Sequence, residues 1–149
     1  MSSFWVRPAT AADARAVRDL ARRVGREFRV APRRREYGAA PGSDDLAWVV
    51  EAGRGKIVGS CALRDAEDGS WELHSLNLEP DWRGFGLGRS LVEHALRVAR
   101  GAGALSVVCL APPEFAEART LLERLGFRDT GRTHASGEAA LEVVFTQAS

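Results

Sequence analysis

The amino-acid sequence predicts a mixed α/β sandwich, in which a mostly antiparallel sheet is flanked by helices. Two observations support this fold class. Between residues 46 and 79, three apolar runs are separated by turn residues, as expected of an antiparallel meander. After Pro80 the apolar period lengthens to that of helices, and helical segments then alternate with strand-like ones. The 149 residues contain no internal repeat, low-complexity tract or linker, so we expect one domain over residues 1–149.

The first 45 residues predict a strand, a helix and a loop. Residues Phe4 to Arg7 form a short apolar run that Pro8 closes, which is typical of a strand. Thr10 begins a helix, because its hydroxyl can cap a free backbone N–H and Asp13 places negative charge in the first turn. Apolar residues follow at helical spacing at Val17, Leu20, Val24 and Phe28. From residue 30 to 44, Pro, Gly and Arg predict a loop.

The remaining elements follow from the same patterns. The meander strands are predicted at Leu46–Ala52, Lys56–Arg64 and Trp71–Glu79. A helix is predicted from Leu87 to about Gly101, and a strand buried on both faces from Leu105 to Leu110. A second helix with apolar positions from Phe115 to Leu125 stops at Gly126, and residues 127–134 and 141–145 form a closing hairpin.

Composition excludes several classes of function. The 21 basic and 20 acidic side chains nearly cancel, whereas bulk electrostatic binding of nucleic acid needs a basic excess. No apolar run approaches the roughly 20 residues that span a bilayer, and Met1 to Pro8 lacks the features of a signal peptide, so we expect a cytoplasmic protein that binds neither nucleic acid nor membrane. Cys61 and Cys109 are expected to be buried free thiols, and no Cys or His spacing predicts a metal site.

The stretch from Pro80 to Arg89 carries the chemistry, because it follows a strand directly and opens a helix. Unpaired amides at a helix start, together with the helix dipole, form an anion site. Glycines let the backbone approach a phosphate closely, and the arginines add positive charge. We therefore predict a pyrophosphate cradle; the alternative is that the glycines only make a tight turn. Its residues are Arg83, Gly84, Phe85, Gly86, Leu87, Gly88 and Arg89.

This segment resembles a known family. Arg83-x-x-Gly86-x-Gly88, preceded by the strand from Leu73 to Pro80, is similar to the acetyl-CoA signature of the GNAT superfamily of N-acetyltransferases. Residues 118–127, which end in Leu-Gly-Phe, resemble a later helix of that family. The resemblance implies acetyl-CoA as cosubstrate, held at its pyrophosphate by amides from Arg83 to Arg89. It also implies that backbone groups of Leu76 and Leu78 bind the pantetheine arm like an added strand.

The resemblance implies direct transfer of acetyl to a small primary amine, without a covalent acyl-enzyme or a metal. A base must then take a proton from the amine, and the candidates are Glu72, at the position of the family's general-base glutamate, and His74. The alternatives are that Glu72 only faces solvent and that His74 is structural. Many members protonate the leaving thiolate with a tyrosine, and the corresponding residue here is Leu122, which cannot donate a proton. A CoA- or acyl-CoA-binding sensor with weak or no catalysis is therefore the second hypothesis.

Two further expectations concern partners. Nine arginines lie between Arg15 and Arg35, where the family's fold roofs the acceptor pocket. Arg22, Arg23 or Arg26 could clamp an anionic acceptor, or the arginines could form a solvated helix face. The resemblance also implies a possible homodimer through the C-terminal strands.

Overall fold

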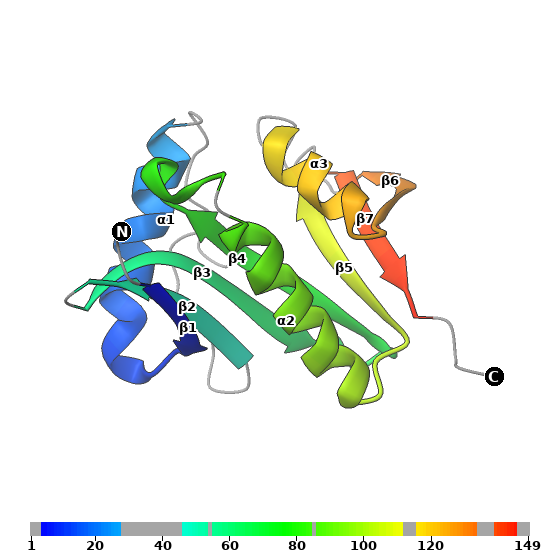
Figure 1. The fold of residues 1–149 in the computed structure, drawn as a ribbon. Helices are drawn as coiled ribbons and strands as arrows, with labels where there is room; N and C mark the ends of the chain where they lie inside the picture. Colours follow the sequence, from blue (N-terminus) through cyan, green and yellow to red (C-terminus); the bar gives the residue numbers. More distant parts are fainter. Residues whose placement is uncertain are drawn as a thin grey trace.

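A computed structural model of the chain describes residues 4–27, 46–53, 55–84, 86–111, 116–133 and 139–145 (Figure 1). Its seven described strands form one sheet in the order β1-β2-β3-β4-β5-β7-β6. The strands are β1 (Phe4–Pro8), β2 (Leu46–Ala52), β3 (Lys56–Asp65), β4 (Ser70–Leu78), β5 (Ser106–Ala111), β6 (Arg128–Thr133) and β7 (Ala139–Val144). The helices are α1 (Ala14–Glu27), α2 (Leu87–Gly101) and α3 (Ala116–Arg124), with short 3-10 turns at Ala11–Asp13 and Pro80–Trp82.

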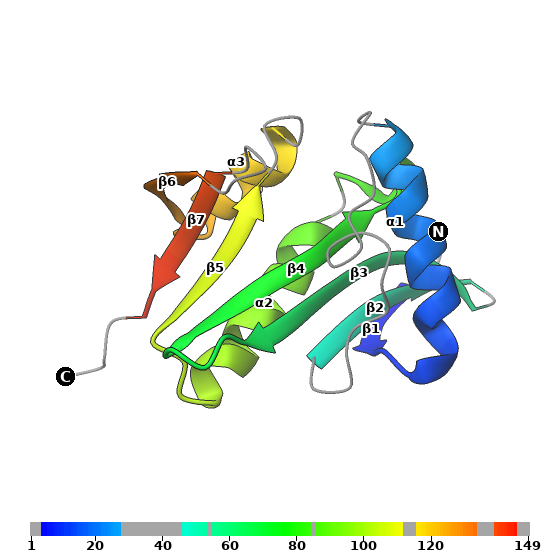
Figure 2. The same ribbon diagram turned by 180° about the vertical axis from the view of Figure 1, so that it is seen from behind.

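The described helices cover the two faces of the sheet unequally. Helices α2 and α3 pack on one face, and α1 packs on the other, across β3 and β4 (Figures 1 and 2). The larger core lies under α2, whose Leu91 and Ala95 are fully buried together with Leu63, Leu73 and Val107 of the sheet. A smaller core joins α1 to the sheet through Leu20 and Val49. Each buried leucine or valine among them contributes about 1.5–3 kcal/mol, so both faces stabilise the sheet.

The element order predicted from sequence is confirmed, and most strand and helix ends lie within one residue of their predicted positions. β2 and α2 have the predicted bounds, and the antiparallel meander of β2, β3 and β4 is present. At the first helix, a 3-10 turn precedes α1, and the Asp13 carboxylate accepts the Thr10 backbone N–H at 2.7 Å. Helix α1 continues through Gly25, which neither breaks nor ends it.

The prediction that the segment around β5 is buried on both faces is wrong. Val107 and Cys109 point into the core, but Val108 and Leu110 on the other face are only half-buried, and Leu105 is 58% exposed. The reason is that α1 lies over β3 and β4, and this face of β5 has no described helix against it (Figure 2).

β4 and β5 form the one parallel pair among the described strands, and this pair ends early. Ser70 to Leu73 are paired with Ser106 to Cys109. β4 then continues from His74 to Leu78 with no register partner on β5, while β5 continues alongside β7. The two strands diverge toward their C-terminal ends (Figure 2). None of the described helices is long and apolar enough to cross a membrane.

Candidate active site

A β-bulge in β4 sets the direction of the side chains at the site. Ala62 is paired with His74 and Ser60 with Asn77, so Ser75 and Leu76 together stand opposite Cys61. Ser75 has a φ of 55°, a left-handed conformation that non-glycine residues adopt uncommonly. The extra residue resets the alternation of the strand. Leu76 and Leu78 therefore pack against the same core as Leu73, and Asn77 points to the face on which α1 lies.

The loop after β4 leads the chain into α2 through two glycines. Gly84 has a φ of 86° and Gly86 a φ of 77°, and a Cβ added at either would meet no atom within 4 Å. The space around this turn is therefore open to a ligand. Gly86 caps α2, since its carbonyl accepts the Ser90 N–H at 3.0 Å. The amides of the following first turn have no partner within the helix and point, with the helix dipole, toward that space.

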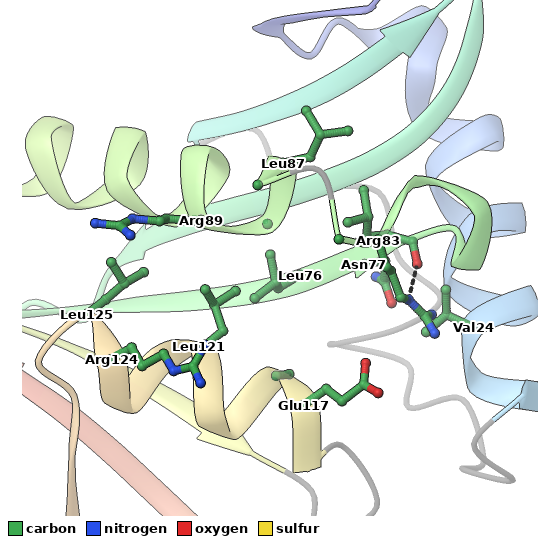
Figure 3. Close-up of a pocket in the computed structure, with 15 residues that line it drawn as sticks. Val24, Leu76, Asn77, Arg83, Leu87, Arg89, Glu117, Leu121, Arg124 and Leu125 are labelled. Atoms are coloured by element: carbon green, nitrogen blue, oxygen red, sulfur yellow. Dashed lines mark hydrogen bonds between the residues drawn. The ribbon is translucent and has the colours of Figure 1, made fainter. Parts of the chain in front are cut away.

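Arg83 fixes the start of this loop. Its Nε donates to the Leu78 carbonyl at 3.1 Å, which ties the guanidinium to the end of β4 (Figure 3). Its backbone N–H donates to the Pro80 carbonyl at 3.2 Å. The Arg83 amide, predicted from sequence to bind pyrophosphate, is thus already bonded, and the remaining amides of the predicted cradle lie beyond it.

A pocket of about 420 Å³ lies between β4, this loop and α3. Eight of the nine residues predicted to bind the cofactor line it: Leu76, Leu78, Arg83, Gly84, Gly86, Leu87, Gly88 and Arg89. The ninth, Phe85, lies outside the described residues. These eight residues come from the stretch 76–89, so β4, the loop and the start of α2 form one wall of the pocket. Gly88 brings the helices together, because a Cβ there would lie 3.1 Å from Cδ2 of Leu121 on α3.

Sequence reasoning missed the other wall of this pocket. It is lined by Val24 of α1, by Asn77 of β4, by Glu117, Ala118, Leu121 and Arg124 of α3, and by Leu125 directly after α3. The α3 residues lie three to four apart, so the helical period could have placed them on one face. Whether this face points toward α2 depends on tertiary packing, which no local sequence pattern predicts.

Charged side chains line both ends of the pocket, and the Arg83 guanidinium lies at the same end as Asn77 and Val24 (Figure 3). Arg89 and Arg124 lie toward one end, whereas the carboxylate of Glu117 lies toward the other, together with Val24 and Asn77 (Figure 3). Arg89 also pairs with Glu93 one helical turn later, at 2.6 Å. The end with Arg89 and Arg124 suits phosphate groups, while the opposite end combines the cation of Arg83, the carboxylate of Glu117 and the apolar Val24.

The two candidate bases lie on β4 before the bulge and do not line this pocket. Glu72 pairs with Arg64 of the neighbouring strand at 2.9 Å. It lines a separate hollow of about 680 Å³ on the face opposite α2, over β4, β5 and β7. His74 is buried, and its Nδ1 lies 3.0 Å from the Ser75 hydroxyl. By strand alternation both side chains point away from the core that holds Leu73.

The remaining candidates do not line this pocket. Leu122, at the position of the family's tyrosine, is 1% exposed and belongs to the core. Arg23 pairs with Glu79 at 2.6 Å, and Arg22 approaches Asp19 at 3.9 Å. Arg26 is exposed on α1. Among the described residues, no group of three His, Cys, Asp or Glu side chains is placed to hold a metal ion.

Comparisons with known proteins agree with this geometry. In sequence, 83 residues are 36% identical to mycothiol acetyltransferase of Beutenbergia cavernae; they cover 55% of this chain but 28% of that protein, so the chain spans well under a third of this relative. In structure, the chain superposes on a GNAT-family acetyltransferase of Staphylococcus aureus Mu50 with a TM-score of 0.83 at 12% identity, covering 97% of this chain and 100% of the other.

A second solved structure was determined with coenzyme A bound. It is the PaiA N-acetyltransferase of Thermoplasma acidophilum, with a TM-score of 0.78 at 15% identity and coverage of 96% and 99% of the two chains. At these identities the superpositions establish the fold. The model of the acetyltransferase (GNAT) family matches residues 14–127, which is most of the chain. The chain therefore belongs to the GNAT family of acetyltransferases.

Proposed function

We propose that this chain transfers the acetyl group of acetyl-CoA directly to a small primary amine. The observation that supports this most strongly is the pocket at the break between β4 and β5. Its glycine turn, helix N-terminus and arginines suit a pyrophosphate, and the sheet edge beyond Leu73 has no strand paired to it on β5. A pyrophosphate joined to an extended polar arm, as in CoA, matches both halves of this pocket.

The donor is proposed to lie along β4. Backbone groups of Leu76 and Leu78 would pair with the pantetheine arm as a further strand would, and the first-turn amides of α2 would hold the pyrophosphate. Both leucines line the pocket and also pack on the core, so the edge that they present is held firmly. One amide of this edge would then donate to the acetyl carbonyl and stabilise the oxyanion that develops on it.

Direct transfer is favoured over a cysteine acyl-enzyme. Burial raises the pKa of the Cys61 thiol to about 12, so this thiol stays protonated at neutral pH and is a poor nucleophile. Cys109 is also buried in the core. Neither cysteine lines the pocket.

Glu72 and His74 are proposed to receive the proton of the acceptor amine. Because neither lines the donor pocket, this transfer would run through water on the face opposite α2. Among the described residues that line the pocket, Glu117 is the one with a carboxylate. A variant of Glu117 can therefore be compared with variants of Glu72 and His74 when the base is tested.

The test measures CoA binding by calorimetry and thiol release with a panel of primary amines. Acetyl-CoA should bind, and amines should stimulate release of free CoA thiol. A chain that binds neither CoA nor acetyl-CoA would contradict the proposal.

The second candidate is a CoA-binding sensor with weak or no catalysis. The leucine at position 122 favours it, because α3 then offers no hydroxyl at the family's tyrosine position. A thiolate leaves readily enough for water to protonate it, so we retain the enzyme as the leading proposal. Tight binding without amine-stimulated thiol release would decide for the sensor.

A further inference from the structure

Asn77 carries a buried carboxamide that has no partner in the described protein. Its residue is 2% exposed, and among the described residues neither Nδ2 nor Oδ1 has a hydrogen-bond partner. Buried polar groups are nearly always satisfied, and an unpaired one destabilises the folded protein. An orphaned amide that borders a ligand pocket therefore needs an explanation.

The local structure shows why the protein itself does not satisfy this amide. Ser60 is the cross-strand partner of Asn77, but its hydroxyl donates to the Ser75 carbonyl at 3.0 Å. The bulge turns Asn77 away from the core and toward α1, where the pocket lining next to it is the apolar Val24. The nearby Arg83 guanidinium is held by the Leu78 carbonyl. The amide thus lies in the pocket wall between groups that are either apolar or already hydrogen-bonded to other atoms.

We infer that Asn77 is a substrate-binding residue whose carboxamide hydrogen-bonds the amide groups of the pantetheine arm. This inference rests on the proposed function. A carboxamide presents an acceptor oxygen and an amino group with two N–H donors, and the arm, with two secondary amides, offers both a carbonyl and an N–H. Asn77 stands between Leu76 and Leu78, whose backbones are proposed to carry the same arm. Both amide atoms are buried in the free protein, so the wall between Val24 and Asn77 must give way slightly as the arm enters.

A ligand-binding role for Asn77 predicts a change in the stability of the free protein that a structural role does not predict. If Asn77 serves a ligand, the free protein bears the penalty of the unpaired amide, and removing it should stabilise the fold. Asn77→Leu keeps a similar shape without polar atoms. It should raise the Tm by about 2–4 °C, the shift that corresponds to one small increment of stability in a chain of this size. The same change should weaken CoA binding about tenfold or more, since two hydrogen bonds are lost.

Ser60→Ala is the matched control on the neighbouring strand. Ser60 is buried to the same extent, 2% exposed, but its hydroxyl is satisfied by Ser75. Its truncation should lower the Tm. A rise for Asn77→Leu beside a fall for Ser60→Ala would therefore separate an orphaned amide from a satisfied one.

The experiment is calorimetric titration of the wild type, Asn77→Leu and Asn77→Asp with CoA and with adenosine 3′,5′-bisphosphate. The second ligand has nucleotide phosphates but no pantetheine arm. We expect both variants to lose affinity for CoA and to bind the nucleotide fragment within about twofold of the wild type. Asn77→Asp keeps the shape and replaces the N–H donors with a second acceptor oxygen, so it provides the comparison of the two ligands should Asn77→Leu fail to fold.

The outcomes distinguish this inference from the proposed function. A wild type that does not bind CoA contradicts the proposed function itself. Unchanged CoA affinity in Asn77→Leu overturns the inference alone. Unchanged CoA affinity with a raised KM for the amine overturns it in favour of an acceptor-binding role. Equal loss of both ligands would show that the variant disturbs the cradle, and that result would also overturn it.

Discussion

Replacing Gly88 with glutamate tests the donor pocket at the point where its walls approach most closely. Gly88 lies in the first turn of α2, and an added Cβ would lie 3.1 Å from Cδ2 of Leu121. That is closer than ordinary van der Waals contact, so the Leu121 side chain must move by a few tenths of an ångström. Both residues line the pocket, and the longer glutamate side chain would carry a negative charge into or beside it.

The expected effect on stability is small. Gly88 has no positive φ, and glutamate is a better helix former than glycine by roughly 0.5 kcal/mol. A carboxylate near a helix N-terminus adds about 0.3–1 kcal/mol. The displaced end of a flexible leucine costs an amount of the same order, so the terms nearly cancel.

The expected effect on binding is large. Two like charges 4 Å apart repel by about 1 kcal/mol in water and about 4 kcal/mol at an effective dielectric constant of 20. These energies correspond to roughly fivefold and a thousandfold in Kd, before any steric exclusion. We expect CoA affinity to fall at least tenfold while the Tm changes by a few degrees at most.

Gly101→Glu is the control for this variant. Gly101 ends the same helix, and a Cβ there would meet no atom within 4 Å. It has the same change in charge but lies far from the pocket, at the helix end where a carboxylate is slightly unfavourable. Calorimetric titration with CoA and thermal unfolding of both variants complete the test. If Gly88→Glu binds CoA as tightly as Gly101→Glu, the pocket is not the donor site.

Three further predictions test other parts of the molecule. The hydrogen bond from Arg7 lowers the pKa of Asp13 to about 2. The ionised Asp13 carboxylate therefore stabilises the fold fully above its unfolded pKa near 3.9, and this stabilisation is lost as the pH falls toward 2. Asp13→Asn should lower the free energy of unfolding at pH 7 by about 2 kcal/mol and flatten this pH dependence in urea titrations. Leu122→Tyr should overpack the core and cost about 1–3 kcal/mol while CoA still binds, whereas faster turnover would show that the hydroxyl reaches the thiolate. Glu72→Gln should lower kcat below the pKa of the acceptor amine, with recovery at high pH and unchanged acetyl-CoA affinity; an unaltered pH–rate profile would assign the proton to His74 or to no side chain.

The cradle was predictable from sequence because its cause is local. Adjacent residues determine the positive φ at Gly84 and Gly86 and the unpaired amides of the helix start. A strand–glycine–helix pattern in the sequence therefore predicts both features. The meander was predictable for the same reason, since turn residues and apolar alternation define its strands. Eight predicted residues consequently line one pocket.

The orientation of β4 was not predictable in this way. The bulge depends on Ser75, a non-glycine residue held at a φ of 55° by tertiary contacts, such as the bond from the Ser60 hydroxyl to its carbonyl. Alternation counted through the bulge would place Leu76 and Glu72 on the same face of the sheet. The structure instead puts Leu76 in the donor pocket and Glu72 in a hollow on the other side. The contribution of α1 through Val24 is equally a matter of packing.

The break between β4 and β5 and the bulge in β4 together explain why a site exists at this position. If the parallel ladder continued beyond Leu73, β5 would occupy the edge of β4, and no extended ligand could pair with it. If β4 continued without the bulge, Leu76 and Leu78 would leave the core and Asn77 would enter it with an unpaired amide. With both features present, the two leucines anchor the strand and its free edge faces the glycine turn. The irregularity at Ser75 and the unsatisfied amide at Asn77 each reduce stability, and ligand binding is the process that would offset the second of them.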